Sequence, residues 1–127
     1  MAVSDNRPFF LNLLKIRLPV TGFVSILHRV SGMLLFLSVP FMVYLFELSL
    51  QSEKGFLLTH EILAMPLVQL ILLVLLWSII HHFFAGIRFL MTDFDIGLDK
   101  KQSIAYAWGV FITEALVFIV FVVGFFL

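Results

Sequence analysis

Three stretches of this chain are each long enough and apolar enough to cross a lipid bilayer as a helix. They cover about residues 21–48, 64–91 and 104–127. A helix needs about 20 predominantly apolar residues to span the hydrocarbon core. The three stretches leave almost no chain for a soluble domain. The sequence therefore predicts an all-α integral membrane protein with three transmembrane helices, organised as a single domain over residues 1–127.

Composition supports a membrane location and narrows the chemistry. The chain is 62% hydrophobic and 13% charged, whereas a soluble domain is about half apolar and about a quarter charged. Its net charge of zero gives no reason to expect a nucleic-acid partner. The absence of cysteine excludes disulfides, thiolate-held iron–sulfur clusters and covalently attached haem. A redox group would therefore need histidine ligands, and the candidates are His28, His60, His81 and His82.

The distribution of Lys and Arg predicts the orientation of the chain in the membrane. Positive charges gather at one end of the first two predicted helices and in the connection after them: Arg7, Lys15, Arg17, Arg29, Arg88, Lys100 and Lys101. The connection over residues 49–63 has a single positive charge, Lys54. This connection is expected to be a loop. The positive-inside rule then places the N-terminus in the cytoplasm of a bacterium, or in the mitochondrial matrix. Residues 1–20 do not resemble a secretory signal and are expected to lie at the cytoplasmic membrane surface.

The first predicted helix carries a polar stripe near its inner end. Ser25, His28, Arg29 and Gly32 follow the spacing i, i+3, i+4, i+7, which puts them on one helical face. Polar groups inside a membrane are costly, and they usually face protein, a cofactor or a water-filled cavity. Each residue alone has an ordinary explanation, such as a serine bonded to a preceding carbonyl or a snorkelling arginine. Their occurrence on one face favours a binding site.

The second predicted helix carries a matching stripe at the same membrane level, formed by Ser78, His82, Gly86 and Asp93. His82 followed one turn later by Gly86 supplies an imidazole and a gap, which suits a flat macrocycle such as haem. The alternative is a histidine hydrogen-bonded to another helix. A second axial ligand would come either from His28 or from another subunit. We expect the latter, because His28 lies beside Arg29 and suits a carboxylate or a quinone oxygen.

Several of these residues belong to motifs of a known family. The chain reads R-P at residues 7–8, I-R-L-P-V-T at 16–21 and S-I-L-H-R-V-S-G at 25–32. A later signature combines His82, Gly86, Ile87, Arg88 and Asp93. Together with the length and the three predicted helices, these motifs resemble the cytochrome b subunit of succinate dehydrogenase over essentially the whole chain.

The resemblance implies an anchor subunit of succinate:ubiquinone oxidoreductase with no flavin or succinate site of its own. This chain would form half of a heterodimeric helical bundle with a second small three-helix anchor. The two would share one haem b and dock an iron–sulfur subunit and a flavoprotein on the cytoplasmic side.

The resemblance also implies roles for individual residues. His82 would be an axial haem ligand, with the other supplied by the partner anchor. Ser25 and Arg29 would line the ubiquinone site, and His28 would lie near the haem propionates and the quinone. Arg88 would contact a propionate. The family often continues G-I-R with His, whereas Phe89 stands at that position here, which removes one propionate contact.

Glu114 raises rival hypotheses. It lies about 15 Å along the third predicted helix, where a carboxylate is costly unless it is protonated or paired. It is either a neutral acid bonded to the partner anchor, a proton-linked or haem-tuning group, or the proton site of a small transporter. The transporter hypothesis leaves the two stripes unexplained and lacks an internal repeat. A haem-free structural anchor is a further alternative. A di-haem cytochrome would need four helical histidines, and His60 is expected in a loop.

Overall fold

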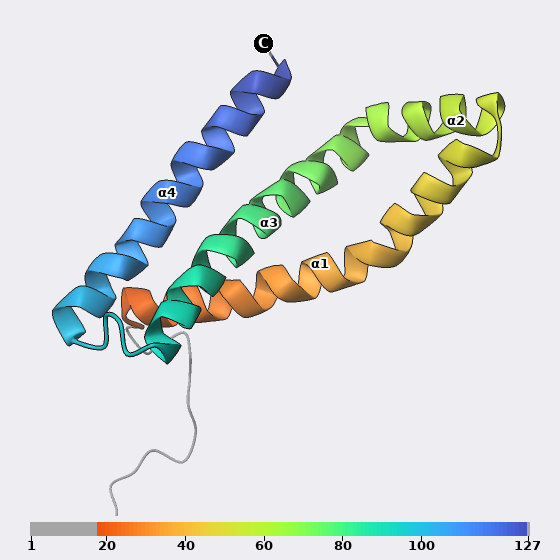
Figure 1. Ribbon diagram of the computed structural model, residues 1–127. Coiled ribbons are helices and arrows are strands. Elements are labelled where there is room, and N and C mark those ends of the chain that lie inside the picture. Colours follow the sequence, from red (N-terminus) through yellow and green to blue (C-terminus); the bar gives the residue numbers. More distant parts are fainter. Residues whose placement is uncertain (1–17, 127) are drawn as a thin grey trace, which may run out of the picture.

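A computed structural model describes residues 18–126 of the chain, so most of the segment predicted at the membrane surface lies outside the described residues. Within that range the structure is helical and contains no strand. The helices are α1 (Val20–Gln51), α2 (Glu53–Ala64), α3 (Pro66–Asp93) and α4 (Lys100–Phe126) (Figure 1). Three of them, α1, α3 and α4, are long and apolar enough to cross a membrane, as the sequence predicts.

The longest helix, α1, is bent. Its course changes direction partway along its length (Figure 1), and the helix contains an internal proline, Pro40. Proline has no N–H to donate to the carbonyl four residues earlier, and its ring crowds that carbonyl, so a kink is its usual effect inside a helix. The bend separates the halves of α1 and α3 next to α2, here called outer (Figure 1). The opposite halves stay in contact, and they are called inner because the charge distribution predicts that they face the cytoplasm.

The connection between the first two spans is a helix and not the loop predicted over residues 49–63. Ser52 caps this helix, α2, because its hydroxyl accepts the backbone N–H of Gly55 at 3.0 Å. Glu53 lies in the first turn, where a carboxylate favours the helix dipole. The prediction is wrong because charged side chains on a short amphipathic helix look like loop residues in the sequence. As a result, α2 bridges the outer ends of α1 and α3 (Figure 1).

Gly55 lets α2 approach the end of α1. A Cβ atom at this position would collide with the backbone carbonyl oxygen of Leu48, and backbone cannot move aside cheaply. We expect Gly55→Ala to lower stability by about 1–3 kcal/mol, as overpacking does. Thermal unfolding of the purified protein, compared with Gly124→Ala, measures this effect. A Cβ placed at Gly124 would have no atom within 4 Å, so equal melting temperatures for the two variants would contradict the prediction.

The inner ends of α1, α3 and α4 meet around a small apolar core of Val24, Ala85, Ala107 and Val110. Ala85 and Ala107 are fully buried, and such small residues let membrane helices approach closely. The turn between α3 and α4 uses Asp95 and Gly97, both with positive φ. This core therefore holds together the end of the bundle at which both predicted stripes lie.

Candidate functional site

The two predicted stripes face each other across the contact between α1 and α3. The imidazole rings of His28 and His82 stack with their centroids 4.1 Å apart and their planes within 10°. Phe89, one turn beyond Gly86 on α3, lies against the other side of the site, 5.1 Å from the His28 ring. One part of each stripe thus meets the other in three dimensions, namely His28 and Gly32 on α1 and His82 and Gly86 on α3.

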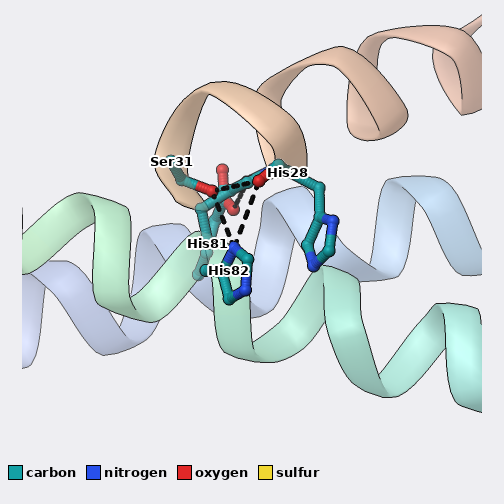
Figure 2. Close-up of polar contacts among 5 residues, drawn as sticks. His28, Ser31, His81 and His82 are labelled. Atoms are coloured by element: carbon teal, nitrogen blue, oxygen red, sulfur yellow. Dashed lines mark hydrogen bonds and ion pairs between the residues drawn. The ribbon is translucent and has the colours of Figure 1, made fainter. Parts of the chain in front are cut away.

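The hydrogen bonds of His82 determine which ring nitrogen carries the proton. Its Nδ1 lies 3.1 Å from the backbone carbonyl oxygen of His28 and 3.3 Å from the Ser31 hydroxyl oxygen (Figure 2). The Ser31 hydroxyl itself donates to the same carbonyl at 2.9 Å. A carbonyl only accepts, so Nδ1 must be the N–H donor. Neutral His82 then has a free lone pair on Nε2, which makes no hydrogen bond with any residue in 18–126.

This arrangement is the one that orients a histidine as a metal ligand. In metal sites the second ring nitrogen usually donates to a carbonyl or carboxylate, which fixes the ring and raises the basicity of the ligating nitrogen. The described residues contain no group of three or more His, Cys, Asp or Glu side chains that could hold a metal ion by themselves. One oriented imidazole does fit a macrocycle such as haem, which brings its own four equatorial nitrogens.

The stacking of His28 on His82 bears on the source of a second axial ligand. Two imidazoles that bind opposite faces of one haem point at each other across the iron. Here the two rings lie side by side and nearly parallel, so they cannot occupy opposite faces in this arrangement. In this arrangement His28 therefore does not supply the second ligand.

The two glycines of the site have different surroundings. A Cβ at Gly32 would lie 2.9 Å from Cε1 of His82, closer than real Cβ atoms approach. A Cβ at Gly86 would lie 3.6 Å from Nε2 of His28, an ordinary contact distance. The close approach that requires glycine is therefore at Gly32 on α1. The gap predicted at Gly86 faces the His28 ring.

Ser25 and Arg29 lie on α1 beside this cluster. Arg29 is exposed and Ser25 is half-buried. Neither makes a hydrogen bond or ion pair with another residue of the described range, so the Ser25 hydroxyl is not engaged by the carbonyl one turn earlier. Ser78 behaves differently, since its buried hydroxyl donates to the Val74 carbonyl at 2.8 Å. Asp93 is exposed at the end of α3. The polar groups of Ser25 and Arg29 are therefore available to bind a ligand. The Ser78 hydroxyl is already hydrogen-bonded within its own helix.

Arg88 and Glu114 belong to the α3–α4 contact. The Arg88 guanidinium donates to the Ser103 hydroxyl at 3.0 Å, and its buried Nε has no partner within the described chain. Glu114 pairs with Nδ1 of His81, so the sequence-based hypothesis that it bonds the partner anchor is corrected to a partner within the chain.

Ser31 and Ser103 were not predicted from the sequence. Ser31 is three residues after His28, but it lies off the predicted stripe.

The comparisons with known proteins identify the family of this chain. Residues 3–124 match the model of the family described as succinate dehydrogenase/fumarate reductase transmembrane subunit. A succinate dehydrogenase cytochrome b556 subunit from Coxiella burnetii is 32% identical over 113 residues, which cover 88% of this chain and 90% of that protein. A subunit of the same name from Paracoccus denitrificans is 29% identical, with 77% and 75% covered.

A third relative of that name, from Rickettsia bellii, is 27% identical over 90% of this chain and 89% of its own. The match to the family model spans nearly all the residues that form α1 to α4. It also contains the complete α1–α3 cluster described above. This chain therefore belongs to the succinate dehydrogenase/fumarate reductase transmembrane subunit family.

Proposed function

We propose that this chain is the haem b-binding anchor subunit of a succinate:ubiquinone oxidoreductase in the bacterial inner membrane. The observation that carries the proposal is the His82 imidazole, whose Nδ1 is held by the His28 carbonyl and whose Nε2 makes no hydrogen bond within residues 18–126. The names of the three relatives, each a cytochrome b556 subunit of succinate dehydrogenase, support it. Haem b, when bound, supplies a one-electron redox centre. His82 would hold it from this chain, and a second small anchor subunit would supply the other ligand.

In this proposal the α1 residues bind ubiquinone. The Ser25 hydroxyl donates a hydrogen bond to one quinone carbonyl oxygen. The exposed Arg29 guanidinium stabilises negative charge that develops on the quinone as it is reduced, an effect strengthened by the low dielectric of the membrane. His28, on the same face of α1 as Ser25 and Arg29, stacks on His82 and passes protons to the quinone from the cytoplasmic side. Quinone reduction consumes two electrons and two protons, and the electrons come from a docked iron–sulfur subunit.

The partners and the orientation belong to the same proposal. The iron–sulfur and flavoprotein subunits dock on the cytoplasmic side, where the N-terminus and the α3–α4 turn lie under the positive-inside rule. Glu114 no longer supports a transporter, because a buried histidine of the same chain accounts for it.

The test of the proposed function is a purification of the complex through an affinity tag on this chain. Mass spectrometry should identify the second anchor, the iron–sulfur protein and the flavoprotein. The dithionite-reduced minus oxidised spectrum should show a b-type α-band, and the complex should reduce ubiquinone with succinate. A complex that reduces quinone but shows no b-type band would mean that this chain is a haem-free anchor. A purified chain with none of these partners would refute the proposal.

The quinone site is tested by Arg29→Leu and Ser25→Ala. We expect Arg29→Leu to lower the succinate:ubiquinone rate by about 10²-fold, as loss of a charge-stabilising donor does. Succinate oxidation with a water-soluble acceptor that takes electrons before the quinone should be unchanged. Lys54→Leu is the control, because Lys54 is an exposed cation on α2, at the opposite end of α1. Equal losses with both acceptors would show damage to assembly and would contradict the assignment.

A further inference from the structure

The contact between α3 and α4 contains a buried polar pair that the proposed function does not use. His81 on α3 is fully buried and Glu114 on α4 is 7% exposed, and the carboxylate bonds Nδ1 of His81. The His81 ring stacks on Trp77 at 5.4 Å and lies 6.0 Å from the Phe111 ring. Its Nε2 is buried without a partner in the described residues. The ring is therefore enclosed on α3 and α4, with the carboxylate of Glu114 as its only polar partner there.

His81 is the immediate neighbour of the proposed haem ligand. Consecutive residues of an α-helix point about 100° apart, so His81 faces α4 while His82 faces α1. Figure 2 shows the two rings on the same turn of α3, with His82 directed at the α1 turn that carries His28 and Ser31. Any rotation of α3 about its axis moves both rings together. The bond that holds His81 therefore also limits the position of His82.

The site has little tolerance for such a rotation. A ring atom about 5 Å from the helix axis moves by about 0.9 Å when the helix rotates by about 10°. The His82 Nδ1 to His28 carbonyl distance is 3.1 Å, near the upper end of the range of about 2.7–3.2 Å found for N–H···O hydrogen bonds. On the other side, Gly32 leaves no spare room beside His82. A small rotation of α3 would thus break the bond that orients the ligand.

We propose that Glu114 is a positioning residue for the haem ligand: by bonding His81, it holds α3 in the rotation that keeps His82 on the His28 carbonyl. This inference rests on the proposed function, in which His82 binds haem. It assigns to α4, which contributes no residue to the α1–α3 cluster, control over the ligand through a different face of α3, about 100° away.

A second polar bond across the same interface makes the inference testable. Arg88 and Ser103 join α3 to α4 two turns away from His81, toward the inner end. The apolar contacts of Ala85, Ala107 and Val110 lie between the two bonds. Loss of the Glu114 bond should therefore leave α4 docked and the protein assembled, while the rotation of α3 becomes less restricted.

The experiment compares Glu114→Leu, Glu114→Gln and Thr113→Leu in the tagged complex. Leucine removes the bond to His81, whereas glutamine keeps a group of the same shape that can still hydrogen-bond Nδ1. Thr113 is the adjacent, exposed residue of α4 and controls for a new leucine in this helix. The readouts are haem content, the midpoint potential of the haem, its low-temperature electron paramagnetic resonance spectrum and the thermal unfolding of the complex.

We expect Glu114→Leu to retain haem but to raise its midpoint potential, because a weaker Nδ1–H bond makes the ligand less basic and favours the reduced iron. A tenfold change in the ratio of reduced to oxidised haem at fixed potential corresponds to about 59 mV for one electron. The resonance spectrum should broaden as the ring orientation becomes less uniform. Glu114→Gln and Thr113→Leu should match the wild type.

The remaining outcomes count against the inference. Equal shifts in the leucine and glutamine variants would show that the charge of Glu114 matters and the bond does not. No shift in either variant, with haem present, would show that α3 is held by other contacts. A wild-type complex without haem would instead refute the proposed function. Thermal unfolding would then still show whether Glu114→Leu, compared with Glu114→Gln, removes a stabilising bond between α3 and α4.

Discussion

Replacing His82 with alanine is expected to abolish the b-type α-band of the purified complex. His82 is the only imidazole in the described chain whose Nδ1 donates to a backbone carbonyl while its Nε2 is left without a hydrogen bond among the described residues. Alanine removes the ligating nitrogen and leaves a cavity beside His28. The reduced minus oxidised spectrum, scaled to the amount of complex, measures the loss directly.

The matched control is His60→Ala. His60 is exposed on α2, at the opposite end of the α1–α3 pair, and it makes no polar contact within residues 18–126. Its substitution should leave the spectrum unchanged. A full α-band in the His82 variant would remove this residue from the haem site and leave the chain as an anchor for haem bound elsewhere. Loss of the band in both variants would point to failed assembly, which mass spectrometry of the complex would detect.

Adding a side chain at Gly32 is expected to have the second largest effect on haem binding. The Cβ of any other residue would lie 2.9 Å from Cε1 and 3.2 Å from Nδ1 of His82. The ring cannot move aside freely, because it is stacked on His28 and bonded to the carbonyl of that residue. Gly32→Val adds two further methyl groups at the same place. The variant must therefore either displace the His82 ring or push α1 away from α3.

Overpacking of this kind costs about 1–3 kcal/mol, which corresponds to about a 5- to 150-fold loss in haem affinity if the cost falls on the bound state. The measurement is the haem content of the complex as haem is removed by a competing apoprotein. Gly109→Val is the control, because no atom lies within 4 Å of a Cβ placed at Gly109 on α4. Equal haem retention in the two valine variants would show that α1 and α3 are not packed as closely as the structure has them.

The sequence alone was sufficient for the class of protein and for the helical faces on which the candidate site residues lie. Three apolar runs of the required length dictate three spans, because a bilayer excludes unpaired backbone groups whatever the tertiary structure. The stripes on α1 and α3 are also predictable without any knowledge of packing. Helical periodicity assigns Ser25, His28 and Arg29 to one face of α1, and it assigns His82 to the striped face of α3. The family motifs include those same residues.

Other features depended on contacts between segments that periodicity does not describe. The helix α2 was predicted as a loop, because charged residues on a short helix and in a turn look alike until Ser52 is seen to cap it. Ser31 was missed, because its role arises from sharing the His28 carbonyl with His82. The gap beside His82 was predicted at Gly86, whereas the closest backbone approach to that ring is at Gly32 on the other helix.

The partner of Glu114 shows most clearly what tertiary structure decided. The sequence indicated that a carboxylate so deep in the membrane needs a partner, because an unpaired charge there is costly. It could not indicate which one, since His81 and Glu114 are separated by a turn whose path sets the register of α4 against α3. A local pattern determines the face on which a side chain lies. Only the relative rotation and axial position of two packed helices determine which side chains meet across that face.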